Sequence, residues 1–339
     1  MNKWRELIKL AGMITPARGL NMLKLTAGFY VSRLLQKPVL WGKPAALSVE
    51  PTTSCNLRCP ECPSGLRAFT RPTGMIDEKL FKEIIVQSKK HVSWLTFYFQ
   101  GEPFLHPGFA EMVSHAVSNR IFTATSTNAH FLDDAAAEKV VRSGLHKLII
   151  SIDGVTQETY QQYRIGGRLE KVLEGTRNIV KWKKQLQSST PHLVFQFVVM
   201  GHNEHEKEKL LMLAGETGVD EVSLKTAQVY DYEHGSPLIP KNEKYARYSL
   251  KADGTYSIRN KLLNHCWKMW HSCVITWDGR VVPCCFDKDA TYVMGEMKKS
   301  SIAEIWRSQA YQDFRGTLLK GRKEIDICRN CTEGTKVWA

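Results

Sequence analysis

The chain has 339 residues, of which 43% are hydrophobic and 24% are charged, a globular composition that excludes wholesale disorder and a fibrous repeat. No stretch approaches the roughly 18 uncharged apolar residues of a membrane-spanning helix. The N-terminus shows neither the apolar segment nor the cleavage site of a secretory signal. These features predict a cytoplasmic protein with one large domain and a smaller appendage.

Positive charge is concentrated near the N-terminus. The formal net charge is +13, and the arm formed by residues 1–45 contributes +7, with Glu6 as its one acidic residue. Apolar residues in the arm recur at helical spacing from Leu20 to Leu35. One interpretation is a helix packed against the main domain; the other is a basic amphipathic helix lying peripherally on an anionic membrane. The basic residues of the arm are Lys3, Arg5, Lys9, Arg18, Lys24, Arg33, Lys37 and Lys43.

From residue 46 onward, short apolar runs alternate with longer helical patterns. Strands alternating with helices predict a parallel sheet, and six such units predict an α/β fold, a (β/α)6 partial TIM barrel over residues 46–227. Ligands of such folds collect at the carboxyl ends of the strands. The predicted strands are 46–52, 94–101, 121–128, 147–154, 192–200 and 219–227. The predicted helices lie near 77–91, 107–119, 133–143, 168–187 and 204–217.

The last third of the chain has a different character. Residues 228–264 are polar and rich in glycine and proline, which indicates a connector. Residues 265–339 form a cysteine-rich tail. Of the nine cysteines, three stand within residues 55–62 and six in the tail. In a reducing cytosol, such clusters predict metal sites rather than disulfides.

The first cysteine group has the spacing Cys55-x3-Cys59-x2-Cys62, in the loop after the first predicted strand. A structural zinc ion takes four ligands, and a catalytic zinc held by three cysteines alone is unusual. Three thiolates suit a [4Fe-4S] cluster better, because one iron then remains free to chelate a small molecule.

This loop resembles the hallmark of the radical S-adenosylmethionine (SAM) superfamily, a CxxxCxxC motif after the first strand of a (β/α)6 partial barrel. The resemblance implies that Cys55, Cys59 and Cys62 hold the cluster and that its open iron binds SAM. It also implies reductive cleavage of SAM to a 5′-deoxyadenosyl radical that abstracts hydrogen from substrate, with an external one-electron donor of the flavodoxin or ferredoxin type. The chain departs from the family at Glu61, where an aromatic residue often precedes the third cysteine.

Residues at the ends of the next strands add to the resemblance. Gln100-Gly101-Glu102-Pro103 is similar to the family's GGEP element, in which glycine permits close backbone approach and the carboxylate suits the SAM ammonium group. Ordinary turn-forming residues are the competing interpretation at strand ends. The resemblance implies further SAM contacts at the ends of the third and fourth strands, from Ser126, Asn128, Ser151 and Asp153.

The tail carries a second pattern, Cys266-x12-Gly279-x4-Cys284 followed by Cys328-x2-Cys331. Gly279 predicts the turn of a β-hairpin. The spacing resembles the start of SPASM and twitch domains, which add auxiliary iron–sulfur clusters to radical SAM barrels. Because eight residues follow Cys331, too few ligands remain for two complete clusters, and we predict one.

This auxiliary cluster is predicted to be a [4Fe-4S] cluster. Cys273 competes as a ligand, because the resemblance implies that a cysteine shortly after the first one can bind. Cys285 must point away from its neighbour if that stretch is extended. A structural zinc ion is the alternative occupant. The predicted ligands are Cys266, Cys284, Cys328 and Cys331.

Barrel and tail together predict a radical SAM enzyme that uses the tail cluster for electron transfer; no catalytic residue is assigned. The resemblance implies peptides, protein side chains and small sugar-like molecules as substrate classes. A peptide or protein substrate is favoured, with a carbohydrate, small-molecule or lipid-linked substrate as the alternative. The charge of +13 suggests a third candidate, RNA modification. Against it, the sequence does not interleave its basic residues with aromatic residues suited to stacking on bases. The remaining candidate is a non-enzymatic electron carrier, which would not need a cluster iron left open for SAM.

Overall fold

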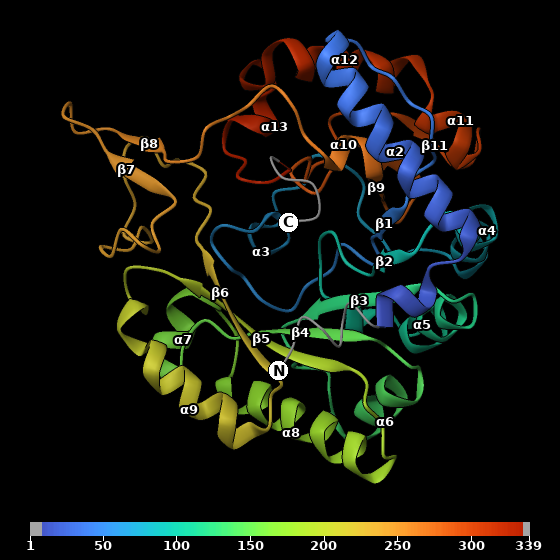
Figure 1. The fold of residues 1–339 in the computed structure, drawn as a ribbon. Coiled ribbons are helices and arrows are strands. Elements are labelled where there is room, and N and C mark those ends of the chain that lie inside the picture. Colours follow the sequence, from blue (N-terminus) through green and yellow to red (C-terminus); the bar gives the residue numbers. More distant parts are fainter. Residues whose placement is uncertain (1–8, 335–339) are drawn as a thin grey trace.

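The computed structural model describes residues 9–334 and contains a nine-stranded sheet flanked by helices (Figure 1). The first eight residues of the predicted arm and the last five of the tail lie outside the described residues. The strand order is β11-β10-β9-β1-β2-β3-β4-β5-β6, and β1 to β6 are all parallel. With β6 and β11 at its two edges, the sheet is an open partial barrel, which confirms the predicted fold class.

All six predicted strands form. They are β1 (Ala46–Val49), β2 (Trp94–Thr96), β3 (Phe122–Thr127), β4 (Lys147–Ser151), β5 (His192–Val199) and β6 (Glu221–Thr226). The five predicted helices also form, as α4 (Glu78–Ser88), α5 (Phe109–Ser118), α6 (Asp134–Arg142), α8 (Leu169–Gln185) and α9 (Lys207–Thr217). Three short elements of the barrel were not predicted: α3 (Pro63–Leu66), η1 (Pro103–Leu105) and α7 (Gln157–Tyr163). The helix predicted near 204–217 begins with a short 3-10 turn, η2 (Glu204–Glu206).

The alternation of side chains along β1 and β2 separates a packed face from a lumen. Leu47 and Leu95 are buried in the main hydrophobic core. Ser48 and Thr96, on the opposite side of the same strands, stay partly exposed. Successive residues of a strand point to opposite faces, so the polar side chains line the concave side of the barrel.

The tail is joined to the barrel through its sheet. The predicted hairpin forms as β9 (Ser272–Ile275) and β10 (Arg280–Val282), which are antiparallel, and Gly279 in the turn has φ +90°. β9 also pairs in parallel with β1, so the hairpin and β11 (Gly295–Glu296) extend the barrel sheet. The helices of the tail are α10 (Lys268–His271), α11 (Ile302–Trp306), α12 (Gln309–Gly321), η3 (Arg322–Glu324) and α13 (Asp326–Arg329).

The connector forms a small antiparallel pair, β7 (Tyr248–Leu250) and β8 (Tyr256–Ile258), which stands out from the body at the left of Figure 1. It follows β6 and leads into the tail. No further β/α unit occurs in this part of the chain, as the sequence predicted.

The arm contributes a long helix, α2 (Pro16–Leu35), that lies against the tail. The Phe29 ring meets the rings of Trp267 and Trp270 edge to face, with centroids 5.3 and 5.6 Å apart. Trp270 Nε1 also donates a hydrogen bond of 3.1 Å to Ser32 Oγ. One face of the helix is therefore packed, as the first interpretation predicted.

The opposite face of α2 is apolar and uncovered. Leu20, Leu23, Tyr30 and Leu34 are 55, 70, 52 and 82% exposed. Their spacing of three, seven and four residues places them on one side of the helix. Within residues 9–334, no helix is long and apolar enough to cross a bilayer.

Candidate iron–sulfur and SAM site

The first cysteine group lies on the loop that follows β1, at the carboxyl end of the sheet. Cys59 is buried, whereas Cys55 and Cys62 are partly exposed. Burial raises the pKa of Cys55 to about 11, and the charge of Glu102 adds to that rise. The free Cys55 thiol is therefore protonated at neutral pH. Metal ions deprotonate coordinating thiols, so this donor set fits an iron–sulfur cluster rather than reactive thiolates.

The segment that follows β2 holds this loop in place through a close backbone approach. Gly101 has φ +75°, and a Cβ atom there would lie 2.2 Å from the Thr52 carbonyl oxygen, so only glycine fits. The Gly101 amide donates a hydrogen bond of 2.8 Å to Ser64 Oγ, and the Glu102 amide donates one of 2.7 Å to the Ser54 carbonyl. Gly101 thus positions both ends of the cysteine loop.

Glu102 joins the ends of β2 and β3 beside the cysteines. Its side chain is 2% exposed. Oε1 accepts a hydrogen bond of 2.8 Å from Thr127 Oγ1, and Oε2 accepts one of 2.8 Å from the Asn128 amide. Burial raises the pKa of Glu102 to about 7, although these hydrogen bonds oppose the rise. Its ionisation therefore falls in the physiological range.

The predicted polar residues of β3 and β4 come together on the same rim. Asn128 Nδ2 lies 3.9 Å from Cys55 Sγ and donates a hydrogen bond of 2.7 Å to Asn56 Oδ1. Ser126 Oγ and Ser151 Oγ are 3.5 Å apart. The rim thus offers hydroxyl and amide groups next to the cysteine loop.

Asp153 reaches the cysteine loop through an arginine that the sequence analysis missed. The Asp153 side chain is fully buried; Oδ2 lies 2.5 Å from Arg164 Nε, and Oδ1 accepts a hydrogen bond of 2.7 Å from the Val198 amide. Arg164 Nη1 lies 3.7 Å from Cys59 Sγ. Burial lowers the pKa of Arg164, but Asp153 and Cys59 outweigh it and raise the pKa, so the guanidinium stays charged.

Glu61, the departure from the family motif, ties the loop to the segment after β6. Its Oε2 accepts a hydrogen bond of 2.8 Å from the Tyr230 amide. The Tyr230 hydroxyl in turn accepts one of 2.9 Å from Lys288 Nζ in the tail. A polar tie thus occupies the position where relatives often carry an aromatic ring.

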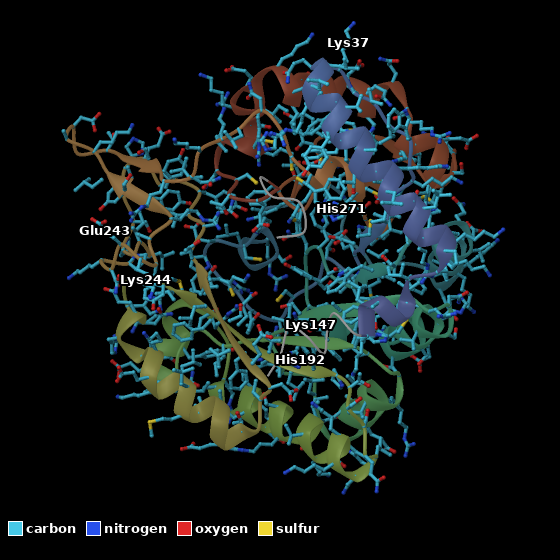
Figure 2. All side chains as sticks on the ribbon, viewed as in Figure 1. Lys37, Lys147, His192, Glu243, Lys244 and His271 are labelled. Atoms are coloured by element: carbon cyan, nitrogen blue, oxygen red, sulfur yellow. The ribbon has the colours of Figure 1, made fainter. Side chains whose placement is uncertain are left out.

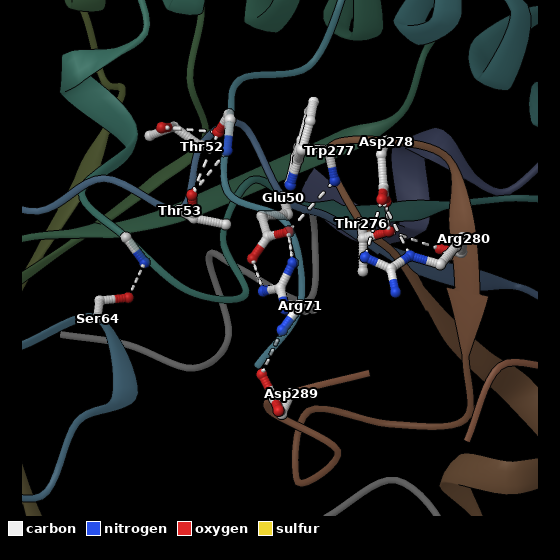
Figure 3. A network of polar contacts seen from close by, with 12 residues as sticks. Glu50, Thr52, Thr53, Ser64, Arg71, Thr276, Trp277, Asp278, Arg280 and Asp289 are labelled. Atoms are coloured by element: carbon white, nitrogen blue, oxygen red, sulfur yellow. Dashed lines mark hydrogen bonds and ion pairs between the residues drawn. The ribbon is translucent and has the colours of Figure 1, made fainter. Parts of the chain in front are cut away.

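A buried ion pair links the segment after the cysteine loop to the tail hairpin (Figure 3). Arg71 donates two hydrogen bonds, of 2.5 and 2.8 Å, to the two carboxylate oxygens of Glu50. The Trp277 amide donates a third, of 3.2 Å, to Glu50 Oε2. Asp289 Oδ1 accepts one of 3.0 Å from the Thr70 amide. Neither group was predicted, because no local pattern marks it.

Four of the tail cysteines line an enclosed pocket. Cys266 precedes α10, Cys284 follows β10, and Cys328 and Cys331 lie at α13. Cys266, Cys328 and Cys331 are buried and Cys284 is partly exposed. Burial raises the pKa of Cys328 to about 12 and that of Cys331 to about 11. Four thiols that line one pocket, three of them buried, suit a metal centre of four ligands.

The other two tail cysteines lie outside this group. Cys273, in β9, pairs with Leu47 of β1, and its thiol lies near Arg315 and Tyr311. It does not line the four-cysteine pocket. Cys285 packs against a small apolar cluster that contains Phe99. The geometry thus favours the four predicted ligands over Cys273.

A cavity of about 860 Å³ runs along the concave face of the sheet to the tail cysteines. Lys268 Nζ lies 3.1 Å from Glu333 Oε2 in its wall. Polar residues lining the cavity include Ser48, Thr96, Lys225, Asn260 and Ser272.

Two family models match the chain in the same order as these two sites. Residues 49–214 match the radical SAM superfamily, and residues 266–332 match an iron–sulfur cluster-binding domain, SPASM. The chain belongs to the radical SAM superfamily and carries a SPASM domain. It is an enzyme whose cofactors are [4Fe-4S] clusters and SAM.

Individual relatives are distant. The chain is 27% identical to the tungsten-containing aldehyde ferredoxin oxidoreductase cofactor-modifying protein of Pyrococcus furiosus, over 79% of this chain and 82% of that one. It is 23% identical to the PqqA peptide cyclase of Gluconobacter oxydans, over 87% and 84%. Among solved structures, BtrN in complex with AdoMet and 2-DOIA shares the fold, with a TM-score of 0.53, 20% identity and coverage of 86% and 93%.

Proposed function

We propose that this radical SAM enzyme oxidises a side chain of a peptide or protein that enters the lumen cavity. The cavity carries this proposal: it joins the concave face of the sheet to the tail cysteines. A volume of about 860 Å³ accepts an extended side chain with its flanking backbone. The similarity to PqqA peptide cyclase supports a peptide substrate.

The roles of the site residues follow from their positions. Cys55, Cys59 and Cys62 would hold the first cluster, which with SAM supplies the 5′-deoxyadenosyl radical. Glu102 would bind the SAM ammonium group, because it lies beside the cysteine loop and becomes charged near neutral pH. The SAM carboxylate would meet the cation of Arg164, which Asp153 holds.

Further polar contacts to SAM would come from the rim residues Ser126, Asn128 and Ser151. In this assignment Gly101 acts by positioning the loop. Residues 46–227 serve as the SAM-cleaving unit, and residues 265–339 as the auxiliary unit on the same sheet.

The tail site would accept the electron that the substrate radical loses when the substrate is oxidised. Hydrogen abstraction converts 5′-deoxyadenosyl radical and substrate into 5′-deoxyadenosine and a substrate radical. Loss of one electron and one proton then gives the product. The four-cysteine pocket would hold the cluster that accepts this electron, and the lumen cavity reaches Cys284 in its wall.

Stimulation of 5′-deoxyadenosine release by fractions of source-cell extract tests the substrate class. We expect protease to destroy the component of the extract that stimulates release. When cells are grown on deuterated amino acids, deuterium from this component should appear in 5′-deoxyadenosine. The Lys268→Ala variant, altered in the lumen, should lose the stimulation and keep basal SAM cleavage. A protease-resistant stimulator that passes a small-pore filter would overturn the peptide proposal in favour of a small molecule.

The first cluster also needs an electron from outside, and we propose a donor of the flavodoxin or ferredoxin type. The net charge of +13 complements an acidic carrier and would speed the encounter at low salt. Reduction rates that fall steeply as salt rises would support this pairing, and rates independent of salt would contradict it.

A peripheral membrane contact through α2 is the remaining proposed partner. The exposed stripe defined by Leu20, Leu23, Tyr30 and Leu34 is flanked by basic residues, and Lys37 projects beyond the end of the helix (Figure 2). Residues 9–45 contain no Asp or Glu. Pairing with a second copy would bring like charges together, whereas an anionic bilayer complements both the stripe and its charge.

Co-sedimentation with vesicles tests the membrane contact. We expect binding to vesicles with about one-third anionic lipid, weaker binding at high salt, and none to neutral vesicles. Replacing Leu23 and Leu34 together by Ser should lower binding at least about tenfold, since each buried side chain contributes about 1.5–3 kcal/mol. Leu211→Ser, at an exposed leucine of α9, is the matched control. Equal binding by both variants would contradict the proposal.

A further inference from the structure

Arg322, at the start of η3, is buried among the tail thiols. Its side chain has no solvent exposure. Nη2 donates to Cys331 Sγ at 3.2 Å and to the Glu333 carbonyl at 2.8 Å, and Nη1 donates to the His265 carbonyl at 3.1 Å. It lines the same pocket as the four predicted ligands. The guanidinium is therefore a fixed part of the pocket wall.

One atom of this guanidinium has no partner. Arg322 Nε is buried and makes no hydrogen bond within the described part of the chain. A buried, unsatisfied N–H on a charged group is costly, so such an atom indicates an acceptor that completes the site. Iron–sulfur clusters present sulfur acceptors, and hydrogen bonds to their sulfurs help to set their potentials. The orphaned donor therefore fits a cluster in this pocket.

The charge of Arg322 is not cancelled by a carboxylate. Among the described residues Arg322 forms no salt bridge, and an arginine guanidinium stays charged in proteins. Arg164, the arginine beside the first cysteine group, is instead neutralised by Asp153 at 2.5 Å. The tail pocket thus carries a net positive group that the first site lacks.

We propose that Arg322 is a positioning residue that raises the reduction potential of the tail cluster above that of the first cluster. A four-thiolate [4Fe-4S] centre carries a net charge of about −2 when oxidised and about −3 when reduced. A buried cation stabilises the more negative form, because the low dielectric strengthens its attraction. The inference rests on the proposed electron-accepting role of the tail: a higher potential lets this cluster take the electron from the substrate radical.

A redox titration of the reconstituted enzyme, monitored by EPR, tests the effect of Arg322 on the tail potential without any substrate. We expect Arg322→Gln to lower the ratio of reduced to oxidised tail cluster at least about tenfold at a fixed potential, which is 59 mV for a one-electron couple. The first cluster should titrate as in the wild type. Arg322→Lys, which keeps the charge, should stay close to the wild type. Lys323→Gln removes one exposed charge next to the site and is the matched control.

The outcomes separate this inference from the proposed function. An unchanged tail potential in Arg322→Gln would overturn the inference while leaving the proposed oxidation intact. If Arg322→Gln assembles no tail cluster, Arg322→Lys decides: a tail potential close to that of the wild type supports the inference, and one lower by 59 mV or more overturns it. Loss of the cluster in both variants would make Arg322 a structural tie and overturn it. A substrate that proves not to be a peptide would leave the measured potential unaffected.

Discussion

The two cysteine sites differ in how completely the protein closes them. The first offers three thiols on a loop, two of them partly exposed, beside a rim of serine, asparagine and carboxylate groups. The tail offers four thiols drawn from separate segments into an enclosed pocket. A site that must bind and release a small molecule needs an open coordination position, whereas an electron-storing site needs a closed and constant surrounding. The first suits SAM cleavage, and the second suits electron transfer.

The largest effect is expected when the first of the two cysteine sites is removed. Changing Cys55, Cys59 and Cys62 together to Ala should abolish SAM cleavage, by a factor of about 10³ or more, because the described chain offers no other open site of this kind. Iron content should fall by about four per chain, the content of one [4Fe-4S] cluster. Chromatographic detection of 5′-deoxyadenosine and iron analysis measure both effects. Retained cleavage would reject the assignment.

Removal of the tail site should separate cleavage from product formation. Cys328→Ala with Cys331→Ala should also lose about four irons, yet release 5′-deoxyadenosine and form no product, because the substrate radical then lacks its acceptor. Cys273→Ala is the matched control and should keep the tail cluster, since its thiol lies near Arg315 instead. If Cys273→Ala alone loses the cluster, the four-ligand set is wrong.

A milder change tests the role of Arg164, the arginine that pairs with Asp153 beside Cys59. Asp153→Asn should free Arg164 and raise the KM for SAM about 10- to 100-fold, the usual cost of losing a supporting residue. Asp134→Asn, which breaks the exposed pair with Lys181, should change nothing. Initial rates of SAM cleavage across a range of SAM concentrations measure this effect. An unchanged KM for Asp153→Asn would remove Arg164 from the SAM site.

The smallest expected effect is a pH dependence at Glu102, whose pKa burial raises to about 7. Below that pH the carboxyl is protonated and cannot pair with the SAM ammonium, so affinity should rise as pH rises. Between pH 6 and 8 the gain should be about tenfold, following the ionised fraction. Glu102→Gln should bind SAM weakly and without this pH dependence. Equilibrium dialysis at several pH values decides, and a flat wild-type profile would contradict the assignment.

Features encoded in short stretches of sequence were predictable. The strands at 94–96 and 122–127 were found because apolar runs alternate with polar segments along the chain. The turn at Gly279 was found because Asp-Gly is a strong hairpin signal. The packed helix of the arm was found because its apolar residues recur at helical spacing, and Phe29 indeed packs on Trp267.

Features that depend on distant residues were not predictable. Glu50 and Arg71 pair across 21 residues, and each alone looks like a surface charge. Arg164 lies at the end of the short helix α7, which has too few turns to show a periodic pattern. Arg322 becomes notable only once the fold places it beside Cys331. Single sequences carry turn and period signals but not these long-range contacts.

The pairing of β9 with β1 constrains when the enzyme can be completed. β1 is among the first elements of the chain and β9 among the last, more than 200 residues later, yet they are neighbours in the sheet. During synthesis, one edge of β1 must wait unpaired until β9 leaves the ribosome. Contacts between distant segments form slowly, and unpaired strand edges invite aggregation. The barrel sheet is therefore complete along this edge of β1 only after β9 has been made.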